Sequence, residues 1–312
     1  MTLTLVGLGL GAAEDITIRG LKAVQDADVV LLEIYTSALI DSSLEQLATF
    51  LGKSVREADR ISVEEQADDI LSEAREKRVV LLVAGDPLSH ACMKMHRHGP
   101  PISLVAGRGE LSRHATTHCD LCLRAEQAGV SVEVIHNASI INAIGRTGLQ
   151  LYRFGEVVSI PFFEKNWTPD SFYDKIVQNR RANLHTLCLL DIKVKERSVE
   201  NLMANRMVFE PPRYMSVNVA IEQIRQVDAV KHELAASSCA FGVARLGSKT
   251  AKIVAGNAPG YGRKSCSGTL EQLMSVDFGG PLHSLVICAP HLHDIEEQYF
   301  AHYNCSASQT EQ

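Results

Sequence analysis

A carboxylate stands directly after a strongly apolar run in the N-terminal half of the chain. Residues 79–83 read Val-Val-Leu-Leu-Val, and Ala84, Gly85, Asp86 and Pro87 follow. An unbroken apolar run stopped by glycine and Asp-Pro predicts an interior parallel strand. Backbone and side-chain groups at the carboxyl end of such a strand can contact a ligand, and Pro87 fixes the orientation of Asp86. Asp86 is therefore a candidate ligand contact or, alternatively, the cap of an Asx-type turn.

A glycine-rich turn follows the first predicted strand, residues 3–6, and a helix begins near Asp15. Residues 7–11 read Gly-Leu-Gly-Leu-Gly, which matches the dinucleotide-binding pattern G-x-G-x-x-G only in part. Glu33 ends the second predicted strand, where that motif places its ribose-binding acid. A third polar strand end begins at His136. Spacing alone leaves a nucleotide site open and identifies no reaction.

Composition restricts the class of protein. With 312 residues, of which 46% are hydrophobic, the chain has room for about two domains. Its net charge of -6 gives no indication of the basic surface that binds nucleic acid. The eight cysteines are scattered, which favours a reducing compartment. Because there is no apolar run of about 18 residues and no basic leader, we expect a cytoplasmic protein that does not associate with membranes.

Alternating strands and helices predict an α/β fold in two domains, residues 1–136 and 137–312. The first domain is expected to contain strands at 3–6, 29–32, 79–83 and 132–135 and helices at 15–27, 44–51, 62–77 and 119–129, the third helix starting with a capping box at Ser62 and Glu65. The second is expected to contain strands at 157–160, 184–191, 239–247, 253–256 and 284–288 and helices at 140–149, 170–179, 217–227 and 270–274.

Two segments are predicted insertions. Residues 90–114 lack periodicity, and the segment at 104–115 repeats the pattern of 82–91 without Asp-Pro. A small duplication or translated non-coding sequence explains this repeat better than a second site does. Residues 257–268, rich in glycine, lysine and serine, interrupt the second half.

The residues themselves resemble the diphthine synthases of the tetrapyrrole-methylase superfamily. The matching segments extend over nearly the whole chain, at 5–10, 15–17, 32–37, 85–87, 115–118, 134–138, 148–152, 185–187, 210–216 and 281–285. A series of motifs in order is far more specific than one glycine motif. The segment 210–216, Glu-Pro-Pro-Arg-Tyr-Met-Ser, resembles the eukaryotic form of the family.

The resemblance implies two α/β domains of tetrapyrrole-methylase type with the cofactor cleft between them. It also implies that the cofactor is not bound in the manner of a Rossmann fold. It implies a methyltransferase that uses S-adenosyl-L-methionine and acts in diphthamide biosynthesis on a modified histidine of elongation factor 2. Four methylations, three on an amine and one on a carboxylate, would give diphthine methyl ester. A homodimer without a metal is expected.

The resemblance also implies the cofactor contacts, which are Leu10, Asp86, Ser89, Ser139, Ile140, Leu190, Leu246 and His283. Backbone groups of these residues would form hydrogen bonds with the adenine edge of the cofactor or with the amine and carboxylate of its methionine part. Apolar side chains would cover the adenine ring. No catalytic base is assigned. His118 and His283 are candidates by residue type, and the competing interpretation for each is a hydrogen-bonded structural histidine.

Departures from the family pattern leave two alternatives open. Ser89 stands where the family has glycine, and the 90–114 insertion lies at the cofactor turn, so a non-catalytic relative with impaired cofactor binding is one alternative. A methylase of tetrapyrrole precursors is the other, although residues 185–187 and 211–214 argue against it.

Three further groups have weaker functional interpretations. Cys119 and Cys122 share a helix face, where packing is favoured over zinc binding. An aromatic loop at 162–167 is interpreted as facing a protein substrate, and residues 193–197 as a solvated basic face.

Overall fold

The computed structural model describes residues 1–35, 42–89, 117–196, 201, 203, 204, 206, 208–234, 238–256 and 270–304. Both predicted insertions, 90–114 and 257–268, lie outside these ranges. The chain forms two compact units, Met1–Ser139 and Ile140–Gln312. The predicted domain boundary, after residue 136, falls a few residues before this division.

Unit 1 is built on a parallel sheet with the strand order β3-β2-β4-β1-β5. Its strands are β1 (Thr2–Gly7), β2 (Val29–Glu33), β3 (Arg56–Ala58), β4 (Arg78–Val83) and β5 (Ser131–Ile135). The apolar run of β4 lies at the centre of the sheet, where both faces are buried, as its uninterrupted hydrophobic sequence predicts.

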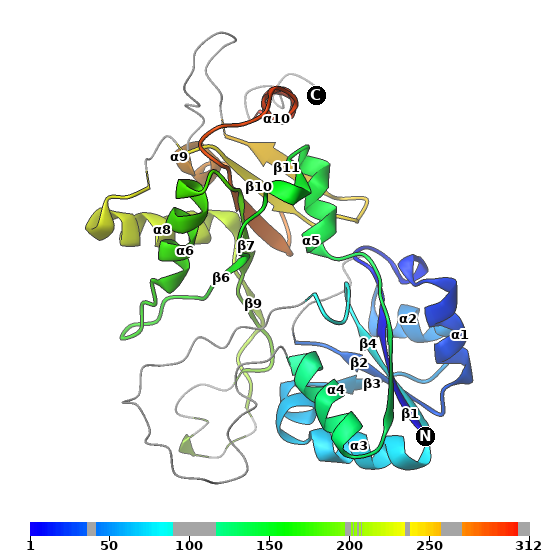
Figure 1. The fold of residues 1–312 in the computed structure, drawn as a ribbon. Helices are drawn as coiled ribbons and strands as arrows, with labels where there is room; N and C mark the ends of the chain where they lie inside the picture. The colour runs from blue at the N-terminus through cyan, green and yellow to red at the C-terminus, as the bar shows by residue number, and fades with distance from the viewer. Residues whose placement is uncertain are drawn as a thin grey trace. The chain divides into compact units, whose positions relative to one another are not determined.

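Helices cover both faces of this sheet (Figure 1). Val80 and Leu82 of β4 pack in the cluster that includes α1 (Ile18–Asp26) and α2 (Leu44–Leu51). The alternate residues of β4 pack with α3 (Ala67–Glu76) and α4 (Thr117–Gln127). The result is a three-layer α/β unit, which confirms the predicted fold class for this half.

The start of α3 differs from its prediction. The capping box at Ser62 is wrong, because Ser62 donates from its backbone N–H (2.9 Å) and its hydroxyl (2.8 Å) to Asp59 Oδ1. A separate wide helical turn, η2 (Ile61–Glu65), precedes α3, which begins only at Ala67. Asp59, rather than Ser62, therefore supplies the capping carboxylate.

Unit 2 contains a mixed sheet with the order β11-β10-β12-β7-β6. Its strands are β6 (Val158–Ile160), β7 (Thr186–Leu190), β10 (Ala240–Ala244), β11 (Lys252–Ala255) and β12 (His283–Ile287). Only the β6–β7 pair is parallel, and β10 and β11 form the predicted hairpin. A two-stranded ribbon, β8 (Ile192–Lys193) with β9 (Arg213–Tyr214), follows the end of β7.

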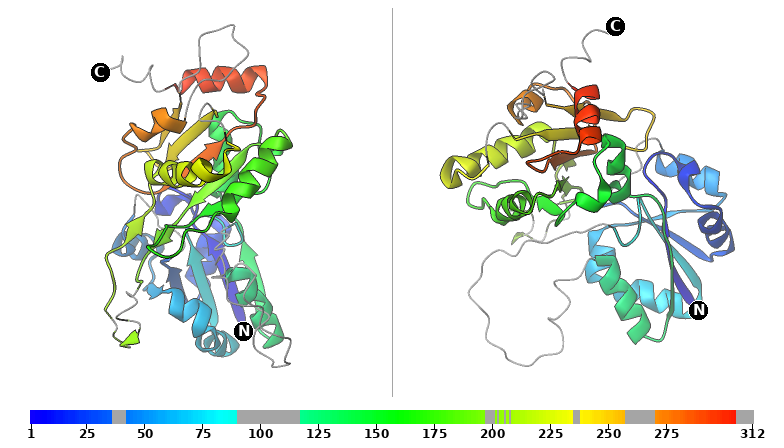
Figure 2. Two further views of the ribbon diagram at one scale, coloured as in Figure 1. Left: turned by 90° about the vertical axis from the view of Figure 1, so that its left-hand side faces the viewer. Right: turned by 45° about the horizontal axis from the view of Figure 1, so that its top comes forward.

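Helices also cover both faces of the second sheet (Figure 2). One face carries α6 (Ser171–Arg181), α8 (Val217–Lys231) and α9 (Leu270–Met274). The other carries α5 (Ile140–Ala143), the 3-10 turn η3 (Ile144–Thr147) and α10 (Asp294–His302). A second 3-10 turn, η4 (Leu151–Arg153), follows η3 and is largely exposed. The single helix predicted over 140–149 is wrong, since α5 tightens into η3 and stops at Gly148, whose φ is 82°. No helix in the described ranges has the length and hydropathy to span a bilayer.

Candidate functional site

Asp86 lies at the carboxyl end of β4 and accepts hydrogen bonds from both sides. Its Oδ1 accepts from Leu88 N (2.9 Å) and Ser89 Oγ (3.2 Å), which is the predicted Asx-type turn. Its Oδ2 contacts His136 Nδ1 (2.8 Å) and accepts from Asn137 N (3.1 Å), both just after β5. Because β1 lies between β4 and β5, the Asp86 carboxylate bridges two strand ends that are not neighbours in the sheet.

The environment of Asp86 keeps its carboxylate ionised. Burial alone, with the residue only 5% exposed, would raise its pKa. The hydrogen bonds from Leu88, His136 and Asn137 outweigh burial and hold the pKa of Asp86 below its ordinary value. The carboxylate is therefore an acceptor at neutral pH.

The glycine turn after β1 is tied to the same edge of the sheet. Gly9 and Gly85 exchange backbone hydrogen bonds of 3.2 and 2.6 Å. Both have positive φ, 79° and 83° respectively, a backbone conformation that favours glycine. Asn137 Nδ2 donates to Gly7 O (2.9 Å) and to Asp15 O (2.9 Å). The loops after β1, β4 and β5 thus form one connected surface.

The predicted unit 1 contacts lie in these loops. Leu10 is half-buried in the glycine turn, and Ser89 ends the Asx-type turn. Ser139, 4% exposed, closes the segment after β5. The described non-glycine residues with positive φ are Asn183, Lys195, His232 and Arg245, so Ser89 is not among them. Serine therefore fits this position without the backbone strain that a glycine-only conformation would impose.

Sequence reasoning placed His136 at the start of a polar strand end but did not identify its side chain as a functional candidate. Its side chain is 66% exposed although Nδ1 is held by the buried Asp86 carboxylate. The available signal was its place as the first polar residue after β5. What the sequence did not show was the contact with Asp86, which depends on the strand order.

The candidate base His118 is a buried residue of α4, 1% exposed. Its Nδ1 contacts Pro87 O (2.7 Å), so this nitrogen carries the proton. Burial lowers the pKa of His118 and outweighs the Pro87 carbonyl and Glu64, which act to raise it. His118 is thus held neutral beneath the Asp86 turn.

The predicted unit 2 residues gather at one edge of the second sheet. Leu190 ends β7, 8% exposed, and Leu246 lies just after β10, 5% exposed. His283 begins β12 and pairs with Ala244, the last residue of β10. Ile140, the remaining member of the set, starts α5 and packs against the core of unit 2.

Both ring nitrogens of His283 are engaged within unit 2. Nε2 donates to Gly280 O (2.9 Å), and Nδ1 accepts from Val217 N (3.4 Å). Burial lowers the pKa of His283 against the opposing effect of the Gly280 carbonyl. This arrangement matches the structural interpretation of the residue.

The aromatic loop and the basic segment meet at the end of β7. Phe162 N donates to Asp191 Oδ2 (3.0 Å). Its ring lies beneath Lys193 Nζ (6.0 Å from the centroid) and the Arg213 guanidinium (5.3 Å). The Lys193 side chain is only 11% exposed and pairs with Glu164 at 2.9 Å, so the prediction that Lys193 is solvated is wrong.

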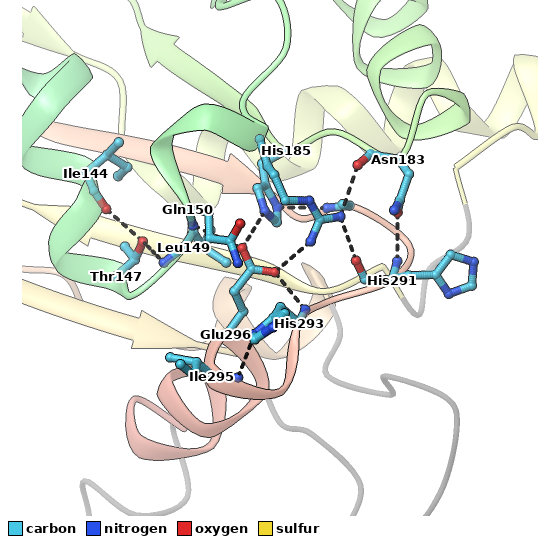
Figure 3. A network of polar contacts seen from close by, with 12 residues as sticks. Ile144, Thr147, Leu149, Gln150, Asn183, His185, His291, His293, Ile295 and Glu296 are labelled. Carbon is cyan, nitrogen blue, oxygen red and sulfur yellow. Dashed lines mark hydrogen bonds and ion pairs between the residues drawn. The ribbon is translucent and has the colours of Figure 1, made fainter.

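A buried polar network in unit 2 explains one of the family-like motifs (Figure 3). Glu296, 0% exposed, accepts from Gln150 N (3.0 Å), His185 Nε2 (3.1 Å), Arg153 NH1 (2.9 Å) and His293 N (2.8 Å). His185 Nδ1 accepts from Ala289 N (3.0 Å). The motif at His185 therefore joins α10 to the body of the unit.

The two cysteines on α4 differ in burial, because Cys122 packs against the core of unit 1 whereas Cys119 is exposed, so the packing interpretation holds for Cys122 only. Cys119 and Cys122 are free thiols, and burial raises the pKa of Cys122 to about 11. Within the described residues, no cluster of three or more His, Cys, Asp or Glu side chains is arranged to hold a metal ion.

Comparison with known proteins places the chain in a family. Residues 2–95 match the family model of tetrapyrrole (corrin/porphyrin) methylases. The diphthine methyl ester synthase of Mus musculus is 43% identical over 314 residues, covering 99% of this chain and 98% of its own. The diphthine methyl ester synthase of Candida glabrata is 43% identical over 303 residues, which cover 96% of this chain and 89% of that protein.

A solved structure supports the same placement. The crystal structure of a diphthine synthase superposes with a TM-score of 0.75 at 32% identity and covers 98% of both chains. Identity at this level over nearly the full length, on the same two-unit α/β fold, establishes the relationship. The chain belongs to the diphthine methyl ester synthase family of tetrapyrrole methylase-type methyltransferases.

Proposed function

We propose that this methyltransferase transfers methyl groups from S-adenosyl-L-methionine to the modified histidine of elongation factor 2. Three methyl groups would go to an amine and one to a carboxylate, giving diphthine methyl ester. The observation that carries the proposal is full-length identity of about 43% to diphthine methyl ester synthases. We further propose that the enzyme works as a homodimer in the cytoplasm, where elongation factors act.

We propose Leu10, Asp86, Ser89, Ser139, Ile140, Leu190, Leu246 and His283 as the residues that hold the donor. The chemistry of this set fits a nucleoside with an amino-acid end, because it combines strand-end backbone groups with the buried leucines 190 and 246. Since the Asp86 oxygens already accept from four groups, Asp86 would act chiefly by fixing the turn that presents Ser89.

The protein's task in this reaction is alignment. The donor, when bound, supplies a methyl group on a positively charged sulfur that is a good leaving group. The surrounding residues must hold the attacking atom in line with that methyl group and exclude water. The tied loops after β1, β4 and β5 suit this task because their geometry is fixed before binding.

The geometry of Ser89 does not support the alternative that this chain is a relative unable to bind the cofactor. Its hydroxyl completes the Asp86 turn rather than disturbing it. Calorimetry with S-adenosyl-L-methionine tests this point, and we expect saturable binding by the full chain. Absence of binding by well-folded protein would favour the non-catalytic relative.

Transfer of labelled methyl groups tests the substrate. We expect label in elongation factor 2 that carries the unmethylated histidine intermediate and none in elongation factor 2 whose target histidine is replaced. Labelling of a tetrapyrrole precursor instead would overturn the proposed function.

A further inference from the structure

The Asp86–His136 pair leaves one imidazole nitrogen available. An ionised carboxylate only accepts hydrogen bonds, so the 2.8 Å contact of Asp86 Oδ2 places the proton of neutral His136 on Nδ1. The lone pair is then on Nε2. The side chain of His136 is 66% exposed, and Nε2 has no hydrogen-bond partner among the residues that the structure describes.

This pair has the arrangement of an oriented base. A buried carboxylate that holds Nδ1–H fixes both the tautomer and the ring orientation, and it stabilises the imidazolium that forms when Nε2 takes up a proton. Asp86 is itself fixed by Leu88 and Ser89, so the support of the ring is rigid.

The position of the pair fits a role in chemistry. His136 follows β5 at the carboxyl edge of the parallel sheet, where α/β proteins bind ligands. Its neighbour Asn137 links that edge to the glycine turn after β1. By contrast, His118 is 1% exposed, and both nitrogens of His283 are engaged. His136 alone of these three combines an oriented ring with an accessible lone pair.

We infer that His136 is the general base that deprotonates the substrate amine before each methyl transfer to nitrogen. This inference rests on the proposed function. The ammonium form of the amine gives its proton to Nε2, which produces a neutral amine and an imidazolium. The amine lone pair then forms the N–C bond while the C–S bond breaks and its electron pair stays on sulfur. The proton leaves Nε2 to solvent.

The inference predicts that loss of His136 affects methylation of the amine but not methylation of the carboxylate. Amine methylation needs the base, whereas the carboxylate is ionised at neutral pH and attacks without one. His136→Asn is the informative variant, because the Asn amide N–H can replace Nδ1–H as donor to Asp86 but cannot accept a proton at the position of Nε2. We expect about a 10²- to 10³-fold slower amine methylation and an unchanged rate of esterification when the substrate already carries the trimethylated amine.

Two further measurements exclude an indirect effect. Calorimetry should give the same affinity of wild type and His136→Asn for S-adenosyl-L-homocysteine. Nitrogen-15 NMR of the full chain should show the Nδ1–H tautomer for His136, lost in Asp86→Asn. His291→Ala removes an exposed imidazole whose ring points away from its neighbours (Figure 3) and should leave both methylations unchanged.

The outcomes are distinguishable. If the wild type methylates neither amine nor carboxylate of the elongation factor, the proposed function fails and the base assignment fails with it. If the wild type is active and His136→Asn methylates the amine normally, the function stands and the base assignment is wrong. Equal losses in amine methylation and esterification would also overturn it, because they would show a structural role.

Discussion

The Asp86 carboxylate joins two strand ends through a small number of hydrogen bonds. Two of its donors lie on its own turn, and two, His136 and Asn137, follow β5. A buried acceptor of this kind costs stability when its charge is removed, since its donors lose a charged partner. The residue thus supports the loops whether or not it also contacts a ligand.

Replacing Asp86 by Asn should lower the free energy of unfolding by about 2 kcal/mol at pH 7, because hydrogen bonds to a charged group are weakened or lost. Urea denaturation of the full chain measures this. Asp69→Asn, at an exposed position of α3, is the matched control and should change little.

The Asp86 effect should disappear in acid. Because the folded pKa of Asp86 is lowered, its stabilisation is present above the unfolded pKa, about 4, and is lost as pH falls through the folded pKa. A difference between wild type and Asp86→Asn that persists undiminished well below the folded pKa would contradict this assignment.

Sequence reasoning identified a structural feature that belongs to a single strand end. It failed to identify a side-chain contact that joins two strand ends. Ser89 was named only through the family resemblance, whereas the Asx-type turn at Asp86 was predicted from the apolar run and its Asp-Pro stop and is confirmed. The partner His136 was not identified, because its contact with Asp86 passes over the end of β1. That juxtaposition follows from the strand order, which hydrophobic periodicity does not determine.

At the scale of elements, the glycine turn after β1 depends on close approach of backbone to backbone. Gly9 has φ of 79°, and a Cβ there would lie 2.8 Å from Asp15 Cβ. Gly9→Ala should therefore lower the free energy of unfolding by about 3 kcal/mol, through φ strain and overpacking together. Chemical denaturation measures the loss.

Gly52 provides a matched control for Gly9. It also has positive φ, 65°, but a Cβ there would meet nothing within 4 Å. Gly52→Ala should cost only about 1 kcal/mol, from φ alone. Equal losses in the two variants would show that the close packing of the glycine turn has no energetic weight.

The C-terminal helix α10 is held by the buried Glu296 carboxylate. Its four donors are Gln150 just before η4, Arg153 in η4, His185 just before β7 and His293 at the start of the helix itself. Glu296→Gln should lower the free energy of unfolding of unit 2 by about 3 kcal/mol, because Arg153 and His185 lose a buried charged partner. Denaturation followed by tyrosine fluorescence measures this, and Glu297→Gln, exposed on the same helix, should be near wild type.

The bounds of two helices were mispredicted for two reasons. A neighbouring residue supplied a better cap in one case, and a residue distant in the sequence packed against the helix end in the other. The sheets, the β10–β11 hairpin and most helices follow from apolar runs and stop signals. The capping box at Ser62 failed because Asp59 offers a stronger acceptor nearby. The helix at 140–149 broke at Gly148, where Tyr299 of α10 packs so closely that a Cβ would lie 2.0 Å from Tyr299 Cγ.

At the scale of the whole molecule, each unit contains a buried neutral histidine. Burial lowers the pKa of His118 and, with opposing contributions from Glu296, that of His185. The unfolded chain therefore takes up protons before the folded chain does as pH falls below about 6.5. Stability should decrease from pH 7.5 to 5.5, by up to about 1.4 kcal/mol per pH unit for each histidine.

Denaturation midpoints at the two pH values check this dependence. His118→Asn keeps a donor to Pro87 O while removing the titrating ring, so the variant should show a smaller decrease between pH 7.5 and 5.5. A decrease equal to that of the wild type would show that protonation of His118 does not limit the stability of the fold in mild acid.

Fold class was predictable because alternating apolar runs and amphipathic helices permit few architectures. The antiparallel order β11-β10-β12-β7 in unit 2 was not, since crossovers leave no local signal. The reaction was predictable only through the ordered series of family-like segments, because a strand-end carboxylate and a glycine turn are compatible with many ligands.

Mass spectrometry of elongation factor 2 is the most direct measurement of the central claim. The factor, carrying the unmethylated histidine intermediate, would be incubated with the full chain and S-adenosyl-L-methionine, and the modified peptide analysed. We predict an increase corresponding to four methyl groups, three on the amine and one on the carboxylate. An unchanged peptide mass, with the enzyme folded and the donor bound, would contradict the account.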